Sequence, residues 1–186
     1  IFGECFDQDV SNLPQGITHI IFGEYFNQDV SNLPPFLTHL TFRNDFNQNI
    51  LNLPLTLTHL TLGNGFNLQS NITPNIKYLK LNCDNEYIIN NLPNSIVELE
   101  LDYHFNLQID NLPTSIKKLS IDKLSRYNHN LNCLPDFIEE LQLNGYYKKR
   151  ILHIPSNLKK LICHKNYPHI NDFAMYEVET YSKSII

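Results

Sequence analysis

Residues 33–52 read LPPFLTHLTFRNDFNQNILN, and this stretch recurs with variations along the whole 186-residue chain. The first proline of this stretch, Pro34, recurs at the same place in each repeat. The series is Pro14, Pro34, Pro54, Pro74, Pro93, Pro113, Pro135 and Pro155. Successive members are 20, 20, 20, 19, 20, 22 and 20 residues apart. A period near ~20 residues predicts a solenoid of stacked repeats, each packed on its neighbours. We call each repeat a rung and number the rungs one to eight from these prolines.

Apolar residues occupy the third, sixth and eighth places after each proline, except in rung four, where Ile76, Leu79 and Leu81 keep the same order one residue early. In rung two they are Leu37, Leu40 and Phe42. The last two alternate with polar residues, which is typical of a half-buried strand. The spacing predicts one short strand per rung, near residues 19–22, 39–42, 59–62, 78–81, 98–101, 118–121, 140–143 and 160–163. Because each strand recurs once per rung, we expect the strands to stack in parallel and form one concave sheet.

A second apolar set stands twelve and sixteen residues after the proline and is expected to fill the core from the convex side. It includes Phe26, Val30, Phe46, Ile50, Phe105 and Ile109. A rung of this length leaves little room for an average helix of ~11 residues, so the convex side should be extended or 3-10 backbone. The Leu-Pro pair marks a return corner, because proline fixes φ and has no N–H to donate.

Glycine and asparagine also recur at set places in the rung. Gly3, Gly23 and Gly63 directly follow predicted strands, and we expect them to allow the next bend. Asparagines thirteen residues after the proline are expected to lie inside the coil and to hydrogen-bond adjacent rungs. They are Asn27, Asn47, Asn67 and Asn106.

These motifs resemble a known family of repeats. The spacing I-x-x-L-x-F, which residues 17–22 follow with Ile20 in the place of the leucine, resembles a leucine-rich repeat. The segment Phe46-Asn47-Gln48, followed by an isoleucine and then by Asn-Leu-Pro, is more closely similar to the FNIP repeat, a leucine-rich-repeat relative of social amoebae and giant viruses of amoebae. The resemblance covers nearly the whole chain but is weaker in rungs four, seven and eight, where Tyr87, Tyr147 and Tyr167 stand near the phenylalanine position.

The resemblance implies a non-catalytic binding solenoid. Some members of the family join the repeats to an F-box, which implies substrate recognition for a ubiquitin ligase. This sequence contains no F-box-like helical segment, so that link would need a segment before Ile1. The chain begins in mid-rung, and its single methionine is Met175, so we expect that a natural start is missing.

We expect one domain over residues 1–186, because the rungs run on without a linker. It comprises a partial rung at residues 1–13, full rungs over 14–174 and a degenerate C-terminal cap over 175–186. In that cap, Val178 and Tyr181 take the third and sixth places after Met175. A short terminal helix that begins near Asn171 or Asp172 is the alternative.

Composition narrows the class of partner. A net charge of −5 argues against nucleic acid, which calls for a basic stripe. No apolar run approaches the ~20 residues of a membrane span. The four cysteines form no C-x-x-C pair, so they indicate neither a zinc site nor a disulfide frame. We therefore expect free thiols, no cofactor, no membrane or nucleic-acid partner, and a cytoplasmic location, in a host cell or a virion.

The outward-facing strand positions are the candidate functional residues. His19, His39 and His59 form a row, but a parallel row splays rather than converging as metal ligands must, and no Cys, Asp or Glu joins it. No serine or cysteine has a histidine and an acid at matching outward places, so we expect no enzyme. The sequence predicts a protein-interaction module that uses the uncharged half of the concave sheet through His39, Thr41, Arg43, His59, Thr61, Tyr78 and Lys80. The alternative is a structural component of a larger assembly or viral particle, in which the repeats are a packing scaffold.

The other half of the sheet carries charges that alternate from rung to rung. One column reads Glu98, Lys118, Glu140 and Lys160, and the column beside it reads Lys117, Glu139, Lys159 and Glu179. We expect each charge to have an opposite charge on either side, and this arrangement would penalise a slip of the strand register. We interpret these columns as structural; a docking surface is the alternative.

Overall fold

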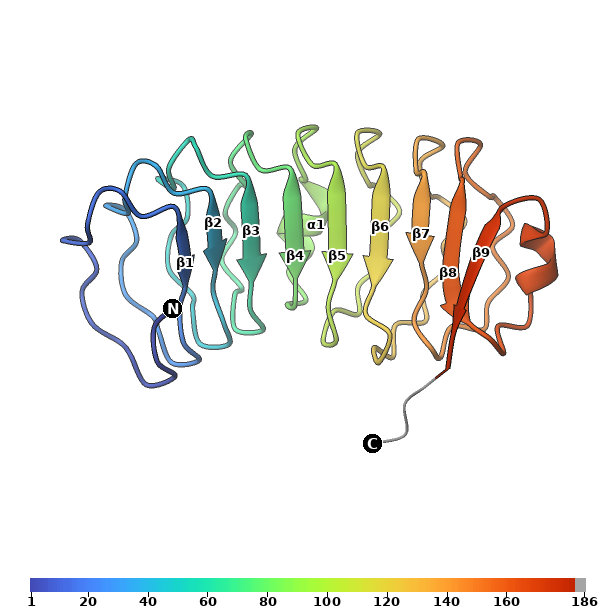
Figure 1. Cartoon of the computed structure of the whole chain (residues 1–186), viewed down its shortest axis with the longest axis horizontal. Helices are drawn as coiled ribbons and strands as arrows, with labels where there is room; N and C mark the ends of the chain where they lie inside the picture. Colours follow the sequence, from blue (N-terminus) through green and yellow to red (C-terminus); the bar gives the residue numbers. More distant parts are fainter. Residues whose placement is uncertain (183–186) are drawn as a thin grey trace.

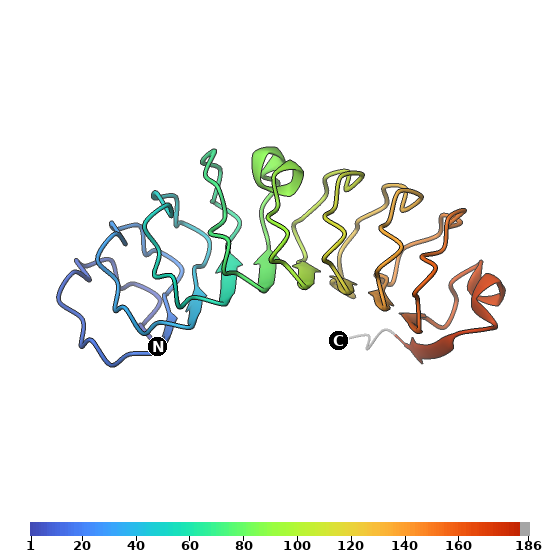
Figure 2. The same cartoon turned by 90° about the horizontal axis from the view of Figure 1, so that it is seen from above.

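The computed structural model describes residues 1–182, which form one curved solenoid (Figure 1). Its single sheet has nine strands in the order of the sequence, and every neighbouring pair is parallel. Seen from above, the strands line the concave side of an arch and the rest of the backbone forms the convex side (Figure 2). The predicted solenoid, β-rich and like a leucine-rich repeat, is confirmed.

Each predicted strand is present, within one residue at either end. The strands are β1 (His19–Ile21), β2 (His39–Thr41), β3 (His59–Leu62), β4 (Tyr78–Leu81), β5 (Glu98–Leu101), β6 (Lys118–Ile121), β7 (Glu140–Gln142), β8 (Lys160–His164) and β9 (Glu177–Tyr181). The register pairs equivalent places of successive rungs, such as Leu40 with Leu60. Both of these leucines are buried. The side chains on either side of each leucine therefore face outward on the concave surface.

Stacked phenylalanines fill the core of the first rungs. One column contains Phe2, Phe22 and Phe42, and the other contains Phe6, Phe26, Phe46 and Phe66. The rings of Phe42 and Phe46 lie 3.5 Å apart between centroids, so the strand side and the convex side meet directly. The prediction that Phe26, Val30, Phe46, Ile50, Phe105 and Ile109 fill the core is confirmed, since all of them are buried.

Rung four departs from the expected extended or 3-10 convex side, because it contains a short helix, α1 (Glu86–Asn90). The place of the core phenylalanine is taken by Asn85, whose side chain accepts a hydrogen bond from the N–H of Ile88 at 3.0 Å. An asparagine that caps the helix in this way satisfies a backbone donor that would otherwise lack a partner. Ile88 and Ile89 then supply the apolar contacts of the missing ring.

The tyrosines of the weaker rungs behave differently from one another. Tyr87 is half-buried and its hydroxyl donates to Asn71 Oδ1 at 3.1 Å, so it lies near the phenylalanine position without filling the core there. Tyr147 and Tyr167 are buried in the core. In rung six, the two extra residues carry Tyr127 into the core, where its ring stacks on Phe105 at 6.3 Å.

The C-terminal cap combines the two arrangements considered for it. A 3-10 helix, η1 (Ile170–Phe173), comes first, and β9 then adds a ninth strand. The predicted register is wrong: Val178 pairs with Leu161 and Tyr181 pairs with His164, whereas Met175 is 96% exposed. The helix buries Phe173, and the chain rejoins the sheet earlier than a full rung would allow, because Glu177 pairs with Lys160. Residues 183–186 of the expected cap lie outside the described chain. Neither α1 nor η1, the helices of residues 1–182, is long and apolar enough to cross a membrane.

The asparagines thirteen residues after the proline link adjacent rungs, but not from inside the coil. The N–H of Asn47 donates to Asn27 Oδ1 at 2.9 Å, and the N–H of Asn67 donates to Asn47 Oδ1 at 3.1 Å. Asn27 and Asn47 are half-buried and Asn67 is exposed, so the predicted interior position is wrong. The buried ring of the preceding residue occupies the interior and leaves the asparagine at the rim.

The predicted role of the glycines as bends is also wrong, because no glycine of the described backbone has a positive φ. Gly63 instead allows close approach of two rungs. A Cβ atom there would lie 2.1 Å from the carbonyl oxygen of Arg43, well inside van der Waals contact.

Candidate protein-binding face

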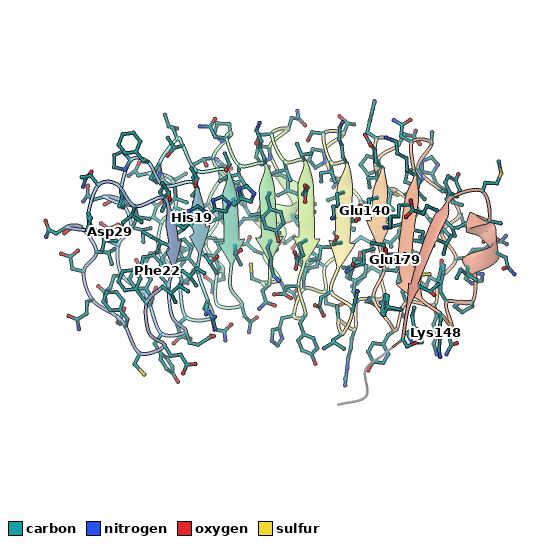
Figure 3. All side chains as sticks on the ribbon, viewed as in Figure 1. His19, Phe22, Asp29, Glu140, Lys148 and Glu179 are labelled. Atoms are coloured by element: carbon teal, nitrogen blue, oxygen red, sulfur yellow. The ribbon has the colours of Figure 1, made fainter. Side chains whose placement is uncertain are left out.

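The structure brings the seven predicted partner-binding residues together on the concave face. His39, His59 and Tyr78 are register partners on β2, β3 and β4, and so are Thr41, Thr61 and Lys80. Arg43 follows β2 and stands in the next outward row, at the place equivalent to Gly63 of the neighbouring rung. Glu140 and Glu179 mark the other half of the same sheet (Figure 3).

The histidines form a continuous stack on this face. Ring centroids lie 4.0 Å apart between His19 and His39, 3.9 Å between His39 and His59, and 5.5 Å between His59 and Tyr78. Each histidine Nδ1 lies 2.9 Å from the hydroxyl of the preceding threonine, which orients the ring. Partial burial, and then the neighbouring rings of His59 and His19, lower the pKa of His39. The middle of the stack is therefore neutral at physiological pH.

Tyr78 and Lys80 belong to a charged network, rather than lying only at the border of an uncharged surface. The Tyr78 hydroxyl donates to Glu100 Oε2 at 2.5 Å, and Lys80 Nζ lies 2.7 Å from Glu100 Oε1 and 3.2 Å from Asp102 Oδ2. Burial alone would lower the pKa of Lys80, but the hydrogen bond and charge of Glu100, together with Asp102, raise it. Burial and then the Glu100 carboxylate also raise the pKa of Tyr78. Lys80 is therefore a cation and Tyr78 a neutral hydroxyl at physiological pH.

A shallow depression of about 380 Å³ lies over the C-terminal ends of β2 to β4. Thr41, Arg43, Thr61 and Lys80 of the predicted set line it. The predicted set lacked the six other lining residues, which are Glu24, Phe42, Asn44, Gly63, Asn82 and Asp102. Glu24 Oε1 forms an ion pair with Arg43 Nη1 at 2.7 Å. Glu24 and Arg43 are about one rung apart in the sequence, so the repeat places their side chains on neighbouring rungs. This spacing was the signal that could have predicted the pair.

The charge columns on the other half of the sheet are in the predicted register but are only partly paired. Lys118 Nζ lies 3.1 Å from Glu140 Oε1, and Lys160 Nζ lies 3.2 Å from Glu177 Oε1. Glu139 has a lysine on both sides, with Lys117 Nζ at 3.3 Å and Lys159 Nζ at 2.5 Å, so the prediction of opposite partners on both sides is confirmed there. It is wrong for Glu98, which makes no ion pair over residues 1–182. In the column of Glu98 each lysine reaches one neighbouring rung, and the column is divided into separate pairs. Glu179 also differs from its prediction, because it pairs with Lys160 at 2.8 Å and not with Lys159.

Reversing one charge in the column tests its contribution to stability. Lys118→Glu is expected to lower the free energy of unfolding by about 0.2–1 kcal/mol for the lost pair, and further by repulsion from Glu98 and Glu140. The loss should be larger at low salt than at high salt, because salt screens exposed charges. Thermal melting at two salt concentrations measures it. Adding Glu140→Lys should recover part of the loss; equal melting of wild type and Lys118→Glu would contradict a stabilising role.

Among the residues that the structure describes, no group of three or more His, Cys, Asp or Glu side chains is arranged to hold a metal ion. The histidine row is held parallel by ring stacking, so its nitrogens do not converge on a point.

Stacked parallel strands, one per rung of about twenty residues, define this protein as a leucine-rich-repeat-like solenoid with a broad concave face. Its repeats are those of a known family: residues 29–65, 67–104, 85–123 and 127–166 match the FNIP repeat. These segments cover well over half of the chain, and the chain belongs to the FNIP repeat family.

One solved structure extends the comparison. CroV588, a protein of the giant virus CroV described as a novel circular LRR protein structure, is similar over 88% of this chain, with 36% sequence identity and a TM-score of 0.71. The matched part is 26% of CroV588, so this chain spans about a quarter of that protein's length. No curated protein matches the sequence.

Proposed function

We propose that this chain is a non-catalytic protein-binding module that holds its partner on the His- and Thr-bearing half of the concave face. FNIP and leucine-rich repeats commonly form interaction modules. The observation that carries the proposal is the depression over β2 to β4, which collects Thr41, Arg43, Thr61 and Lys80 on one accessible surface.

The chemistry of this surface suits a protein partner. The neutral His39 and the short threonines cost little to desolvate, whereas the ion-paired half would lose water from several charges. Tyrosine and arginine are favoured anchors of protein interfaces, and Tyr78 and Arg43 lie at the two sides of the surface. All of these side chains stand on or beside paired strands, so binding costs little conformational entropy.

The state of the cysteines supports a non-catalytic role. Burial raises the pKa of Cys83 to about 12 and that of Cys163 to about 11. Both groups are therefore thiols at physiological pH, and a thiol is a poor nucleophile. The charge of Asp110, followed by burial, raises the pKa of the exposed Cys133 as well.

Charge substitutions in the depression test the proposal. A partner is first recovered from the cytosol of the natural host with the 186-residue chain as bait, and its affinity is then measured with purified proteins. The double variant Thr41→Glu/Thr61→Glu should weaken binding at least about 100-fold, because the partner would have to cover two larger, charged side chains in place of two small hydroxyls.

Ser120→Glu is the matched control. Ser120 follows Thr41, Thr61, Lys80 and Glu100 in the same register column, on the opposite half of the sheet. It should change the affinity less than about threefold. Full binding by the double variant would place the partner elsewhere on the chain.

A further inference from the structure

The turns that follow the strands form the lower edge of the solenoid in Figure 1, which we call the strand-end edge. Its charge changes sign along the molecule. The place two residues before the buried ring, or before its equivalents Asn85 and Ser125, reads Glu4, Glu24, Asn44, Asn64, Cys83, Tyr103, Lys123, Gly145 and Lys165. The place one residue after it reads Asp7, Asn27, Asn47, Asn67, Glu86, Asn106, Arg126, Lys148 and Pro168. The charged residues at both places are acidic in the first rungs and basic in the last, with Glu86 of rung four as the exception.

We define an acidic end and a basic end of this edge. The acidic end contains Glu4, Asp7, Glu24 and Asp45 with one cation, Arg43, for a formal charge of −3. The basic end contains Lys123, Arg126, Lys148, Lys149 and Lys165 with one carboxylate, Asp122, for a formal charge of +4. The two ends are nearly equal in size and opposite in sign.

These charges are not neutralised within the described chain. The five cations of the basic end make no ion pair within residues 1–182, whereas seven other lysines and arginines do: Arg43, Lys80, Lys117, Lys118, Arg150, Lys159 and Lys160. At the acidic end, Glu4, Asp7 and Asp45 likewise make none over the same residues. Exposed apolar groups accompany the charges, namely Tyr25 at the acidic end, Tyr103 between the ends, and Leu124 and Tyr146 at the basic end.

We propose that the strand-end edge joins two copies of this chain in a homodimer, with the copies meeting edge to edge and their ends exchanged. The arch curves in one plane, and the strand-end edge runs along one side of it (Figures 1 and 2). A two-fold axis through the middle of the arch therefore lays one edge along the other over its whole length. Such an interface is isologous, because the same patch of each copy meets its counterpart.

The same axis places acidic side chains of one copy opposite basic side chains of the other. It sets rung one against rung seven, so Glu24 and Tyr25 face Tyr146, Lys148 and Lys149. It sets rung two against rung six, so that Asp45 faces Lys123 and Arg126. The partial rung of residues 1–13 faces rung eight, which brings Glu4 and Asp7 toward Lys165. Every acid–base match occurs twice in the dimer.

A second copy fits the edge better than an unrelated acidic partner. The basic end alone would attract an acidic peptide or a nucleic acid, but the acidic end beside it would repel either one. A second copy is the partner that uses both ends and covers the exposed tyrosines of both. The rows of His39 and His59 and of Thr41 and Thr61 stay open in this dimer. Glu24 and Arg43 belong both to the acidic end and to the depression over β2 to β4, so the variants that test the dimer leave both residues unchanged.

Sedimentation equilibrium of the 186-residue chain tests the association. The dimer should dissociate with rising salt, with a dissociation constant at least about tenfold higher at ~0.5 M than at ~0.02 M salt, because screening acts on exposed charges. A wild-type chain that stays monomeric at both salt concentrations would overturn the proposal.

Two charge-reversed variants test the geometry. The first carries Arg126→Glu, Lys148→Glu and Lys165→Glu, and the second carries Glu4→Lys and Asp45→Lys. Asp7 and Lys123 are left unchanged, because Asp7 accepts hydrogen bonds from the Asn27 N–H and from Gln28, and Lys123 lies over the ring of Tyr181. Each places like charges opposite each other in its own homodimer, so each should dimerise at least about tenfold more weakly than wild type. An equal mixture restores opposite charges at both ends and should form a heterodimer with near wild-type affinity.

The substituted side chains are outside the core and make no ion pair among the described residues, so both variants should melt close to wild type. Homodimers of undiminished affinity, or folded variants that do not associate when mixed, would show that this edge is not the interface.

Discussion

Phe46→Ala is expected to lower the free energy of unfolding by about 3–5 kcal/mol, as the loss of a large buried aromatic does. The ring of Phe46 is 1% exposed, and its centroid lies 3.5 Å from that of Phe42 in the same rung. It also stacks on Phe26 and Phe66, each at 6.1 Å. Removing it therefore opens a cavity that borders three rungs, which the short loops of a 20-residue repeat cannot refill.

The matched control is Phe36→Ala in the same rung, because Phe36 is 62% exposed. It should change stability by no more than about 0.5 kcal/mol. Urea denaturation followed by circular dichroism compares the two. Since each rung is stabilised by its neighbours, hydrogen exchange should show loss of protection in rungs one to three in the Phe46 variant. Equal stability of the two variants would contradict the assignment of Phe46 as a core contact.

Gly63→Ala is expected to have the second-largest effect, at the upper end of about 1–3 kcal/mol of destabilisation. Its Cβ would lie 2.1 Å from the carbonyl oxygen and 2.3 Å from the carbonyl carbon of Arg43. These are backbone atoms, so no side-chain rotation relieves the clash and the two rungs must separate. The hydrogen bond from the N–H of Gly65 to Asn44 O, at 2.7 Å, lies beside this contact and should weaken with it.

Gly16→Ala serves as the control, because a Cβ at Gly16 meets no atom within 4 Å. It should be neutral or slightly stabilising, by up to about 1 kcal/mol, since alanine restricts the unfolded chain more than glycine does. Urea midpoints and slopes of both variants decide the outcome. A Gly63 variant as stable as the Gly16 variant would show that the rungs have room to part at this place.

Much of the fold could be predicted from the sequence, because its determinants are local and repeated. The alternation of His39, Leu40 and Thr41 defines a strand and its buried face in one rung, and the 20-residue period then defines the neighbour of every residue. The seven candidate residues come together for the same reason. Once the register is known, His39 must stand beside His59 and Thr41 beside Thr61.

Where the repeat loses its length or its aromatic residue, prediction failed. Rung four lacks the phenylalanine, and an asparagine that caps a helix replaced it, so an α-helix formed where extended chain was expected. The last rung has no proline to mark its corner, and the 3-10 helix shifted Val178 onto Leu161. In both places the outcome depended on how the buried space could be filled, which a count of residues does not reveal.

The sequence by itself determined the strands, their parallel order, the core columns and the face on which the candidate residues stand, because each follows from a pattern within about twenty residues. Only the tertiary structure decided which charges pair, where glycine is obligatory and how charge is distributed along the strand-end edge. Gly63 shows the difference, since rung two has Arg43 at the equivalent place. Ion pairing and close contact depend on differences of a few tenths of an ångström in the distance between rungs. These distances are set by the packing of the whole stack.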